Sequence, residues 1–318
     1  MGMTFGRIGV LMGGLSSERE ISLKSGKAVY EALSASGQEA LALDITTDDP
    51  QENIRLLESL HLDCAFLALH GRFGEDGTVQ ALLEQLHIPY TSSGVEASKL
   101  TMDKSLFRRV LTQHQVPVPR YKVFTRTTYD GRINLAAVLG MPLVVKPATH
   151  GSSIGLSIVD MEAELPAALE RAFEYDDKII VDEYIKGREL TVGILGDAPL
   201  AVIEIVPKRR LFDYEAKYHV GLTEYLVPAP LDARVSAELK DLAYTVHRLL
   251  GCAGCTRLDM ILRGDDDPVV LELNTIPGFT ETSLLPRAAK CEGITFSQLC
   301  LRLVAIAYEK ARQQPSPA

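Results

Sequence analysis

Four polar residues with related chemistry lie near the C-terminal end of the sequence, in two apolar runs of alternating pattern. The first run carries Arg257 and Asp259, and the second carries Glu272 and Asn274. The Gly/Asp/Pro-rich segment 263–268 between the runs predicts a turn that joins two antiparallel strands. In that register Asp259 lies opposite Glu272. Arg257 then lies opposite Asn274, and period-two alternation places all four side chains on one face of the sheet.

This face is too charged to be part of a core, because buried unpaired charges are strongly disfavoured. Carboxylate and carboxamide oxygens are hard ligands of the kind that Mg²⁺ bound to nucleotide phosphates requires. Arg257 supplies a positive charge for the phosphoryl group being moved. We therefore interpret the hairpin as a magnesium and phosphate site. The alternative is the solvated outer face of a surface hairpin with incidental salt bridges.

A second candidate for phosphate binding lies near the middle of the chain. Lys146 ends an apolar strand and is followed by Gly151, Ser152, Ser153, Ile154 and Gly155, a small loop whose backbone N–H groups can surround phosphate oxygens. The sequence contains neither a Walker A motif nor a G-x-G-x-x-G fingerprint, so a nucleotide must be held in another way. Alone, such a Gly/Ser loop is more often an ordinary turn.

Charged residues near positions 104 and 182–189 extend this candidate site. Lys104 is either a solvated helix lysine or a second phosphate contact. Asp182, Glu183 and Glu189 bracket a strand-to-loop crossing. A backbone edge and a carboxylate there suit the adenine and ribose of a nucleotide. The equally plausible alternative is that the segment is a charged linker between domains.

Composition and charge restrict the class of protein. The 318 residues are 46% hydrophobic and 24% charged, which is typical of a globular protein of two or three domains. The net charge of 33 − 42 = −9 argues against nucleic-acid or anionic-membrane binding. No apolar run is long enough to span a bilayer, and the first residues match neither a signal peptide nor a myristoylation site. We expect a cytoplasmic protein.

The five cysteines do not suggest a disulfide framework or a metal site. Their odd number and scattered positions fit a reducing compartment. Cys252 and Cys255 form the one C-x-x-C pair, without a second pair or a histidine cluster nearby. We expect ordinary small buried residues.

The first hundred residues alternate between predicted strands and helices. A capping-box spacing of Ser17 and Glu20 marks a helix start. The predicted strands are 7–12, 41–45, 64–69 and 89–91, and the predicted helices are 17–36, 53–60 and 77–86. This pattern predicts an open parallel sheet, with ligands at the carboxyl ends of its strands.

The rest of the chain divides into two further units. The second is predicted to contain a helix at 102–114, strands at 142–146 and 156–159, a helix at 161–175 and a strand at 178–185. The third is predicted to contain strands at 190–195 and 201–206, a polar loop at 207–223, a helix at 235–250, the hairpin and a helix at 296–313. We expect domains at 1–99, 100–188 and 189–318, in an α/β chain whose last two parts are α+β.

Several motifs occur in a fixed order along residues 7–310. They are Gly13-Gly14 with Ser17 to Glu20, Leu69-His70-Gly71 with Gly74 to Gly77, Thr101 to Lys104, Lys146 with its Gly/Ser loop, Phe212 to Tyr218, the hairpin, and Asn274 to Gly278 with Ser283-Leu284. Together they resemble the three-domain ATP-grasp superfamily and, within it, the D-alanine:D-alanine ligase family.

The resemblance implies a set of roles for these residues. It implies that the second and third units clamp ATP, and that Asp259, Glu272 and Asn274 hold two Mg²⁺ or Mn²⁺ ions. It places Lys104, Lys146 and Lys217 on the phosphates together with Ser152 and Ser153, and Asp182, Glu183, Ile185 and Glu189 around the adenosine. It places Glu18 and His70 at the first D-alanine, Ser283 and Leu284 at the second, and Arg257 and the Gly278 N–H at the oxyanion.

The implied reaction joins two D-alanines for peptidoglycan synthesis in a cytoplasmic homodimer. Glu18, Ser152 and Tyr218 are expected to form a hydrogen-bonded triad that closes the loop at 207–223 over the site as a lid. Two features depart from the family pattern. Ala148-Thr149-His150 precedes the Gly/Ser loop where relatives often carry an Arg-Glu pair, and Pro207 to Arg210 makes the base of the lid unusually basic.

Two alternatives remain at this stage. One is a related ligase that joins D-alanine to D-lactate or D-serine, against which Tyr218 is the discriminating residue. The other is a nucleotide-binding or small-molecule-binding regulator that has kept the fold and lost catalysis. The regulator is disfavoured because the complete set of Arg257, Asp259, Glu272, Asn274 and Lys217 is present.

Overall fold

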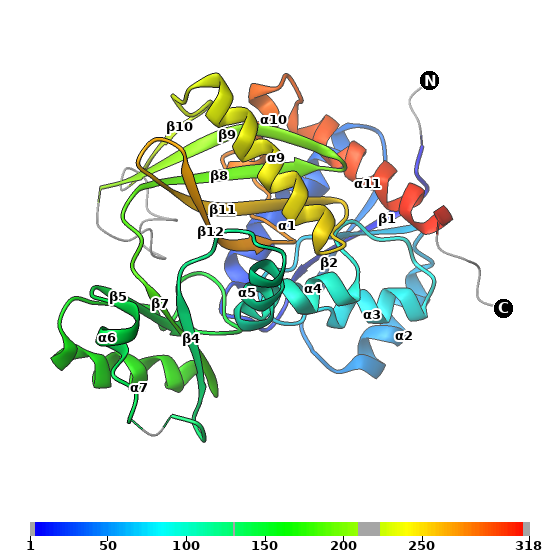
Figure 1. Cartoon of the computed structure of the whole chain (residues 1–318). Helices are drawn as coiled ribbons and strands as arrows, with labels where there is room; N and C mark the ends of the chain where they lie inside the picture. The colour runs from blue at the N-terminus through cyan, green and yellow to red at the C-terminus, as the bar shows by residue number, and fades with distance from the viewer. Residues whose placement is uncertain (1–3, 130, 209–222, 314–318) are drawn as a thin grey trace.

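The computed structural model describes residues 4–129, 131–208 and 223–313, which form three sheets with helices packed against them (Figure 1). The architecture is the mixed α/β class expected from the sequence, and its N-terminal sheet is parallel. Among the described residues, no helix is long and apolar enough to cross a membrane.

The N-terminal sheet has the order β2-β1-β3. Its strands are β1 (Arg7–Gly13), β2 (Glu39–Ile45) and β3 (Cys64–Leu67), and its helices are α1 (Arg19–Ala35), α2 (Pro50–Leu60) and α3 (Thr78–Gln85). β1 is an almost unbroken apolar run because helices and neighbouring elements bury both of its faces. The strand predicted at 89–91 is wrong, since only an isolated bridge joins Tyr90 to Ala65 there.

The first helix does not start as its sequence pattern predicts. It begins at Arg19, with Glu18 as its N-cap residue and without a side-chain cap hydrogen bond, so the capping box of Ser17 and Glu20 is not formed. The Glu18 N–H instead donates to Ser16 Oγ at 3.2 Å. Glu18 therefore lies at the helix start with its carboxylate directed elsewhere.

The helix predicted at 102–114 is α5 (Lys104–Gln113), and another helix that the sequence analysis did not predict, α4 (Val95–Met102), ends just before it. The break lies at Asp103, whose carboxylate accepts hydrogen bonds from the N–H groups of Ser105 and Leu106. An aspartate in this position satisfies the free N–H groups of a new helix and so favours a start there. The break leaves Lys104 as the first residue of α5.

The central unit is an antiparallel sheet of order β4-β7-β5-β6. Its elements are β4 (Tyr121–Thr125), α6 (Leu135–Leu139), β5 (Leu143–Pro147), β6 (Ser157–Val159), η1 (Glu162–Glu164), α7 (Leu165–Tyr175) and β7 (Lys178–Glu183). In β5 Leu143 and Val145 are buried against α6 and α7, so alternation directs Val144 and Lys146 to the opposite face. Figure 1 shows this unit as a separate lobe with α7 below the sheet.

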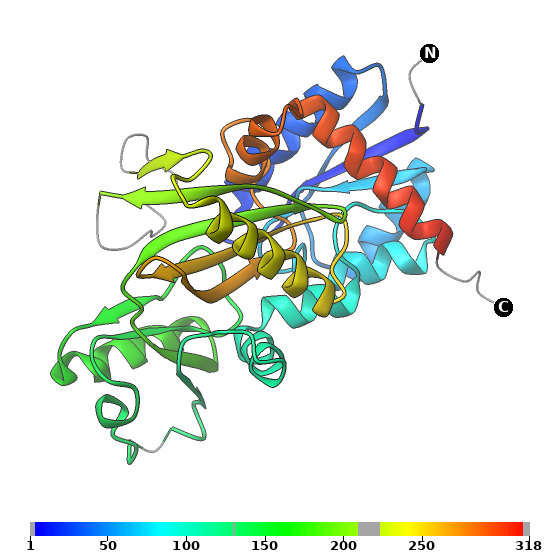
Figure 2. The same ribbon diagram turned by 45° about the horizontal axis from the view of Figure 1, so that its top comes forward.

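The third sheet is antiparallel, with the order β10-β9-β8-β11-β12. Its elements are β8 (Arg188–Leu195), β9 (Ala198–Pro207), β10 (Thr223–Leu226), α9 (Ala233–Leu249), β11 (Cys255–Arg263), β12 (Asp267–Asn274), α10 (Leu284–Cys291) and α11 (Phe296–Gln313). Figure 2 shows the central lobe lying beneath this sheet, so that their facing surfaces come close together.

The largest core cluster joins the first and last parts of the chain. Ile8 and Val29 of the N-terminal unit pack in one cluster with Ile203, Leu285 and Leu303. The N-terminal unit is therefore fixed to the five-stranded sheet by shared apolar burial. The domain limits at 99 and 188 stay a prediction.

Candidate active site

The hairpin has the register predicted from its sequence. Arg257 pairs with Asn274, and Asp259 pairs with Glu272. Arg257 makes two hydrogen bonds to Asp259, from Nε at 2.8 Å and from Nη2 at 2.6 Å. Asp259 also accepts from Asn274 Nδ2 at 3.2 Å and from Thr191 Oγ1 of β8 at 2.6 Å. The carboxylate is thus held in one orientation by three side chains.

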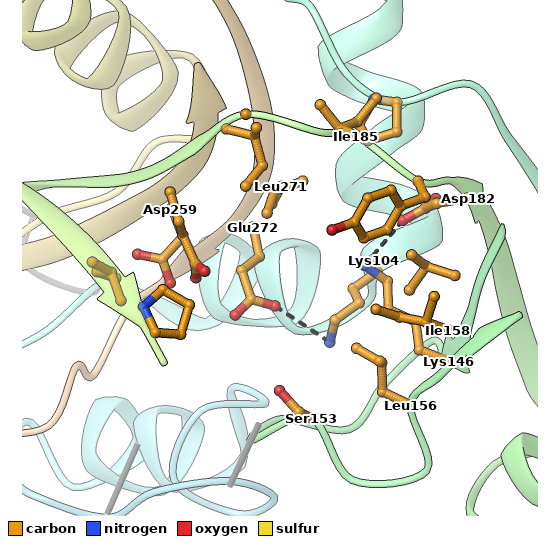
Figure 3. Close-up of a pocket in the computed structure, with 18 of the residues that line it drawn as sticks. Lys104, Lys146, Ser153, Leu156, Ile158, Asp182, Ile185, Asp259, Leu271 and Glu272 are labelled. Carbon is orange, nitrogen blue, oxygen red and sulfur yellow. Dashed lines mark ion pairs between the residues drawn. The ribbon is translucent and has the colours of Figure 1, made fainter. Parts of the chain in front are cut away.

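A β-bulge lies next to this carboxylate. Asp259 pairs with Glu272 but Met260 pairs with Val270, so Leu271 is an extra residue in β12. A bulge can direct two consecutive side chains toward the same side of a sheet. Leu271 and Glu272 accordingly both line the same pocket (Figure 3).

Asp259, Glu272 and Asn274 supply the donor chemistry for a nucleotide-bound Mg²⁺. Two carboxylates and a carboxamide leave coordination positions for phosphate oxygens and water, as Mg²⁺ prefers. Within the described ranges there is no group of three or more His, Cys, Asp or Glu residues placed to hold a metal. The set therefore fits an ion that arrives with the nucleotide better than an all-protein metal cage.

Lys146 reaches the pocket from the outward face of β5. Its Nζ lies 3.0 Å from Asp182 Oδ2, an ion pair drawn in Figure 3. Asp182 is 2% exposed and its Oδ2 also accepts from Arg108 Nη2 at 3.2 Å. Asp182 is thus a counter-ion for two cations, although it still lines the pocket as a nucleotide contact should.

Lys104 approaches the same pocket from the start of α5. Its Nζ donates to the backbone oxygen of His150 at 2.6 Å and lies 4.0 Å from Glu272 Oε2. The side chain is 9% exposed, so its ammonium is directed inward. The solvated-lysine alternative is therefore excluded for Lys104.

The Gly/Ser loop between β5 and β6 has an unusual backbone. Ser152 and Ser153 adopt φ angles of 52° and 58°, a left-handed conformation that costs a non-glycine residue about 1 kcal/mol or more. Ser152 Oγ donates to Glu18 Oε1 at 2.5 Å, which ties the loop to the N-terminal unit. Successive N–H groups in such a turn form a concave anion site.

The residues that precede this loop are held by the carboxylate of Asp176. The Thr149 N–H and Oγ1 both donate to Asp176 Oδ2 at 2.8 Å. His150 Nδ1 lies 3.9 Å from the same carboxylate oxygen. Burial acts to raise the pKa of Asp176, but these donors and the Lys178 N–H outweigh it and the pKa is well below its usual range. Thr149 and His150, which depart from the family pattern, thus anchor the loop to Asp176.

The pocket between the central and C-terminal sheets encloses about 360 Å³. Nine residues predicted for the nucleotide or metal line it, namely Lys104, Lys146, Ser153, Asp182, Glu183, Ile185, Glu189, Asp259 and Glu272. Asn274 lines an adjoining cavity together with Lys104 and Glu272. Residues that are scattered over 170 positions of the sequence therefore converge on one cavity.

His70 is buried, and both of its ring nitrogens have hydrogen-bond partners. Nε2 lies 2.9 Å from Ser25 Oγ, and Nδ1 lies 3.1 Å from the Ile276 backbone oxygen. Burial acts to lower the pKa of His70, but the Glu75 carboxylate, whose Oε1 lies 3.8 Å from Nδ1, outweighs this and raises the pKa. These contacts favour a supporting role in which His70 connects the first helix to the segment after β12.

Comparison with known proteins identifies the arrangement. Residues 48–93 and 110–305 match the family models described as D-ala D-ala ligase N-terminus and C-terminus. The D-alanine--D-alanine ligase of Syntrophotalea carbinolica is 48% identical over 94% of this chain and 95% of its own length. The chain belongs to the D-alanine--D-alanine ligase family. Its fold is therefore the ATP-grasp fold, and the protein is an ATP-dependent ligase.

Solved structures of family members agree with this assignment. The D-alanine--D-alanine ligase of Bacillus anthracis complexed with ATP is 32% identical, with a TM-score of 0.86 over 98% of this chain and 100% of that chain. The VanG D-Ala:D-Ser ligase of Enterococcus faecalis is 30% identical, with a TM-score of 0.82 over 95% of this chain and 99% of that chain. Membership of the family excludes the regulator alternative and leaves the choice of second substrate open.

The remaining predicted site residues of this ligase lie at the start of α10 or outside the described ranges. Ser283 is the N-cap residue of α10 and Leu284 begins that helix, and a Cβ on Gly278 would lie 3.3 Å from Ser283 Oγ. These three residues are therefore neighbours at one helix start. Lys217 and Tyr218 fall outside the residues that the structure describes.

Sequence reasoning missed several residues of the pocket. Val144 and Ile158 supply apolar walls from β5 and β6, Leu271 supplies a third wall, and Tyr184 lies between the predicted contacts 183 and 185. The alternation of β5 was a usable signal for Val144, because Leu143 and Val145 already fill the core face. No sequence signal located the bulge that exposes Leu271.

Proposed function

We propose that this chain joins two molecules of D-alanine into D-alanyl-D-alanine through a D-alanyl phosphate, at the expense of ATP, for peptidoglycan precursor synthesis. The observation that carries the proposal is the convergence of Lys104, Lys146 and the Asp259/Glu272/Asn274 face on one pocket and the cavity that adjoins it. Glu18 joins this pocket to the N-terminal unit through Ser152. Neighbouring cavities thus bring together groups for phosphates, metal ions and an amino acid.

In the first step the carboxylate of the first D-alanine attacks the γ-phosphorus of ATP, and the bond to ADP breaks. Lys104 and Lys146 balance the charge on the phosphoryl oxygens, as positioned cations do in phosphoryl transfer. Glu18 lies at the start of α1 and can hold the substrate ammonium. The Mg²⁺ ions, when held by Asp259, Glu272 and Asn274, supply further charge neutralisation.

In the second step the neutral amine of another D-alanine attacks the carbonyl carbon of the acyl phosphate. A C–N bond forms, the amine loses a proton, and the tetrahedral intermediate collapses as the C–O bond to phosphate breaks. Arg257 and the Gly278 N–H are suited to stabilise the negative oxygen of that intermediate. The N–H groups at the start of α10, beside Ser283 and Leu284, suit the carboxylate of the second substrate.

Hydroxylamine trapping tests the acyl phosphate directly. In the presence of Mg-ATP and D-alanine, hydroxylamine should compete with the second D-alanine and yield D-alanine hydroxamate with one phosphate and one ADP. L-alanine should give none. Absence of hydroxamate together with normal dipeptide formation would contradict the proposed intermediate.

The second substrate is proposed to be D-alanine, with D-serine or D-lactate as the alternatives. Since Tyr218 is proposed to close the lid by bonding Ser152 and Glu18, Tyr218→Phe should loosen the choice of second substrate. We expect a several-fold higher share of D-alanyl-D-lactate when both substrates are supplied, measured by mass spectrometry. An unchanged product ratio would remove Tyr218 from the specificity argument.

A homodimer and a cytoplasmic location stay predictions from the family resemblance. Sedimentation of the purified protein at several concentrations tests the first of these. A single monomeric species at all concentrations would contradict it.

A further inference from the structure

Arg108 is a buried cation whose position is not explained by stability alone. It lies on α5, and its side chain is 0% exposed. Its Nη1 donates to the Val270 backbone oxygen at 3.0 Å and its Nη2 donates to Asp182 Oδ2 at 3.2 Å, whereas Nε has no hydrogen-bond partner among the described atoms. Buried ion pairs often contribute little to stability compared with apolar side chains of similar size. The burial of a charged guanidinium at this position is therefore better explained by its effect on the charged groups around it.

The neighbours of Arg108 form a chain of charges that ends in the nucleotide pocket. Asp182 Oδ2 lies between Arg108 Nη2 and Lys146 Nζ, at 3.2 Å and 3.0 Å. Two cations thus share one carboxylate oxygen, and the formal charge of the three groups is +1. Without Arg108, the pair of Lys146 and Asp182 would be neutral toward a polyphosphate. Buried charges are screened weakly, so this difference extends into the pocket.

The rest of the pocket makes this charge important. Of the described residues that line the pocket, three carry a permanent positive charge, Lys104, Lys146 and Arg188. Six carboxylates also line the pocket, those of Asp182, Glu183, Glu189, Glu204, Asp259 and Glu272. The described lining therefore has a formal charge of 3 − 6 = −3, so each further positive charge close to it favours a polyphosphate. Arg108 adds one such charge from behind the wall of the pocket.

The contact with Val270 fixes where that charge lies. Val270 directly precedes Leu271, the extra residue of the bulge, and its N–H donates to the Pro117 backbone oxygen at 2.9 Å. Arg108 therefore connects β12, which carries Glu272, to β7, which carries Asp182. One side chain thus contacts both the strand that carries Glu272 and the lobe that carries Lys146.

We propose that Arg108 is a positioning residue of the nucleotide site: it neutralises Asp182, so that Lys146 presents a net positive charge to the phosphates. The inference rests on the proposed function only in taking Lys146 as a phosphate-binding residue. Because ADP binding requires no ligase activity, the inference can fail or succeed independently of the reaction.

The test is the affinity for Mg-ADP, measured by titration calorimetry on the full chain. Arg108→Met removes the charge at similar length and should weaken ADP binding about tenfold. Arg108→Met with Asp182→Asn restores a net charge of +1 at Lys146 and should recover most of that loss. The Km for ATP should follow these changes while the Km for D-alanine stays the same.

Two further variants separate charge from structure. Arg108→Lys keeps the charge but cannot reach both partners, and its ADP affinity should stay within about threefold of the wild type. Arg126→Met is the matched control, because Arg126 pairs with Asp177 at the same N–O distance of 3.2 Å on the exposed side of the central lobe. It should not change ADP affinity.

Two results would overturn the proposal. One is an unchanged affinity in Arg108→Met. The other is a loss in Arg108→Met that adding Asp182→Asn does not recover, since a purely structural role predicts no recovery. If Arg108→Met does not fold, Arg108→Lys decides the question: retained affinity supports the charge account, and a tenfold loss contradicts it.

Discussion

Asp259 shows how the residues of the site are held before any ligand binds. Its carboxylate accepts from Thr191, Arg257 and Asn274, side chains of three different strands. Metal ligands whose orientation is fixed by surrounding hydrogen bonds lose little conformational entropy on binding. The two carboxylates proposed to bind metal differ in exposure, since the side chain of Asp259 is 11% exposed whereas that of Glu272 is 29% exposed and lines the pocket.

Glu272→Gln is the direct test of the metal assignment at the residue scale. The amide keeps the size of the side chain but removes the charge, so ATP-dependent phosphate release with D-alanine should fall at least about a hundredfold. The melting temperature should not change by more than a few degrees. Glu238→Gln, on the exposed side of α9, is the control and should retain full activity. Near wild-type turnover in Glu272→Gln would contradict the assignment of Glu272 as a metal ligand.

Among the elements, the loop between β5 and β6 combines a strained backbone with a hydrogen bond to the N-terminal unit. Two consecutive serines with positive φ are strained, and the bond from Ser152 to Glu18 holds the loop against the N-terminal unit. An acyl phosphate is hydrolysed readily, so a site of this kind must exclude water. The hydrogen bond thus links the closed position of this loop to Glu18, the residue proposed to hold the first substrate.

Ser152→Ala should loosen this loop and uncouple ATP use from dipeptide formation. The ratio of phosphate released to D-alanyl-D-alanine formed should rise above one, because water then competes with the second D-alanine. Phosphate and dipeptide assays on the same samples give the ratio. Ser157→Ala on β6 is the control. A ratio of one in both variants would show that Ser152 does not contribute to closure.

The sequence predicted these elements unevenly, for physical reasons. The hairpin register followed from alternation and turn composition, both of which are local, and Lys146 followed from a strand ending at a Gly/Ser loop. The bulge at Leu271 and the position of Arg108 depend on contacts between distant segments, which one sequence does not encode locally. The break at Asp103 was readable in principle, since aspartate is a preferred N-cap residue.

For the whole molecule, stability should depend on pH through His247. This residue lies on α9, is 2% exposed, and contacts Thr256 Oγ1 through Nδ1 at 2.8 Å. Burial lowers its pKa to about 4. In the unfolded chain His247 binds a proton below its ordinary pKa of about 6.5, whereas in the folded chain it stays neutral down to about pH 4. The contribution of neutral His247 to the free energy of unfolding is therefore fully present above about pH 6.5 and is lost as the pH falls toward 4.

The expected loss is on the order of 3 kcal/mol between these two pH values, measured by urea unfolding. His247→Gln should be less stable at neutral pH but should show a flatter dependence over this range. His61→Asn, at an exposed position, should retain the slope of the wild type. An equal slope in His247→Gln and the wild type would assign the pH dependence to other groups.

The three sheets of the molecule bring together the residues that we propose for the nucleotide, the metal ions and the amino-acid substrate, from opposite ends of the chain. The measurement that tests this account most directly is phosphate release from Mg-ATP by the purified protein, with D-alanine, L-alanine, D-serine and D-lactate compared side by side. We predict release that requires D-alanine, with one D-alanyl-D-alanine formed for each phosphate. No release with D-alanine, or equal release with L-alanine, would contradict the account.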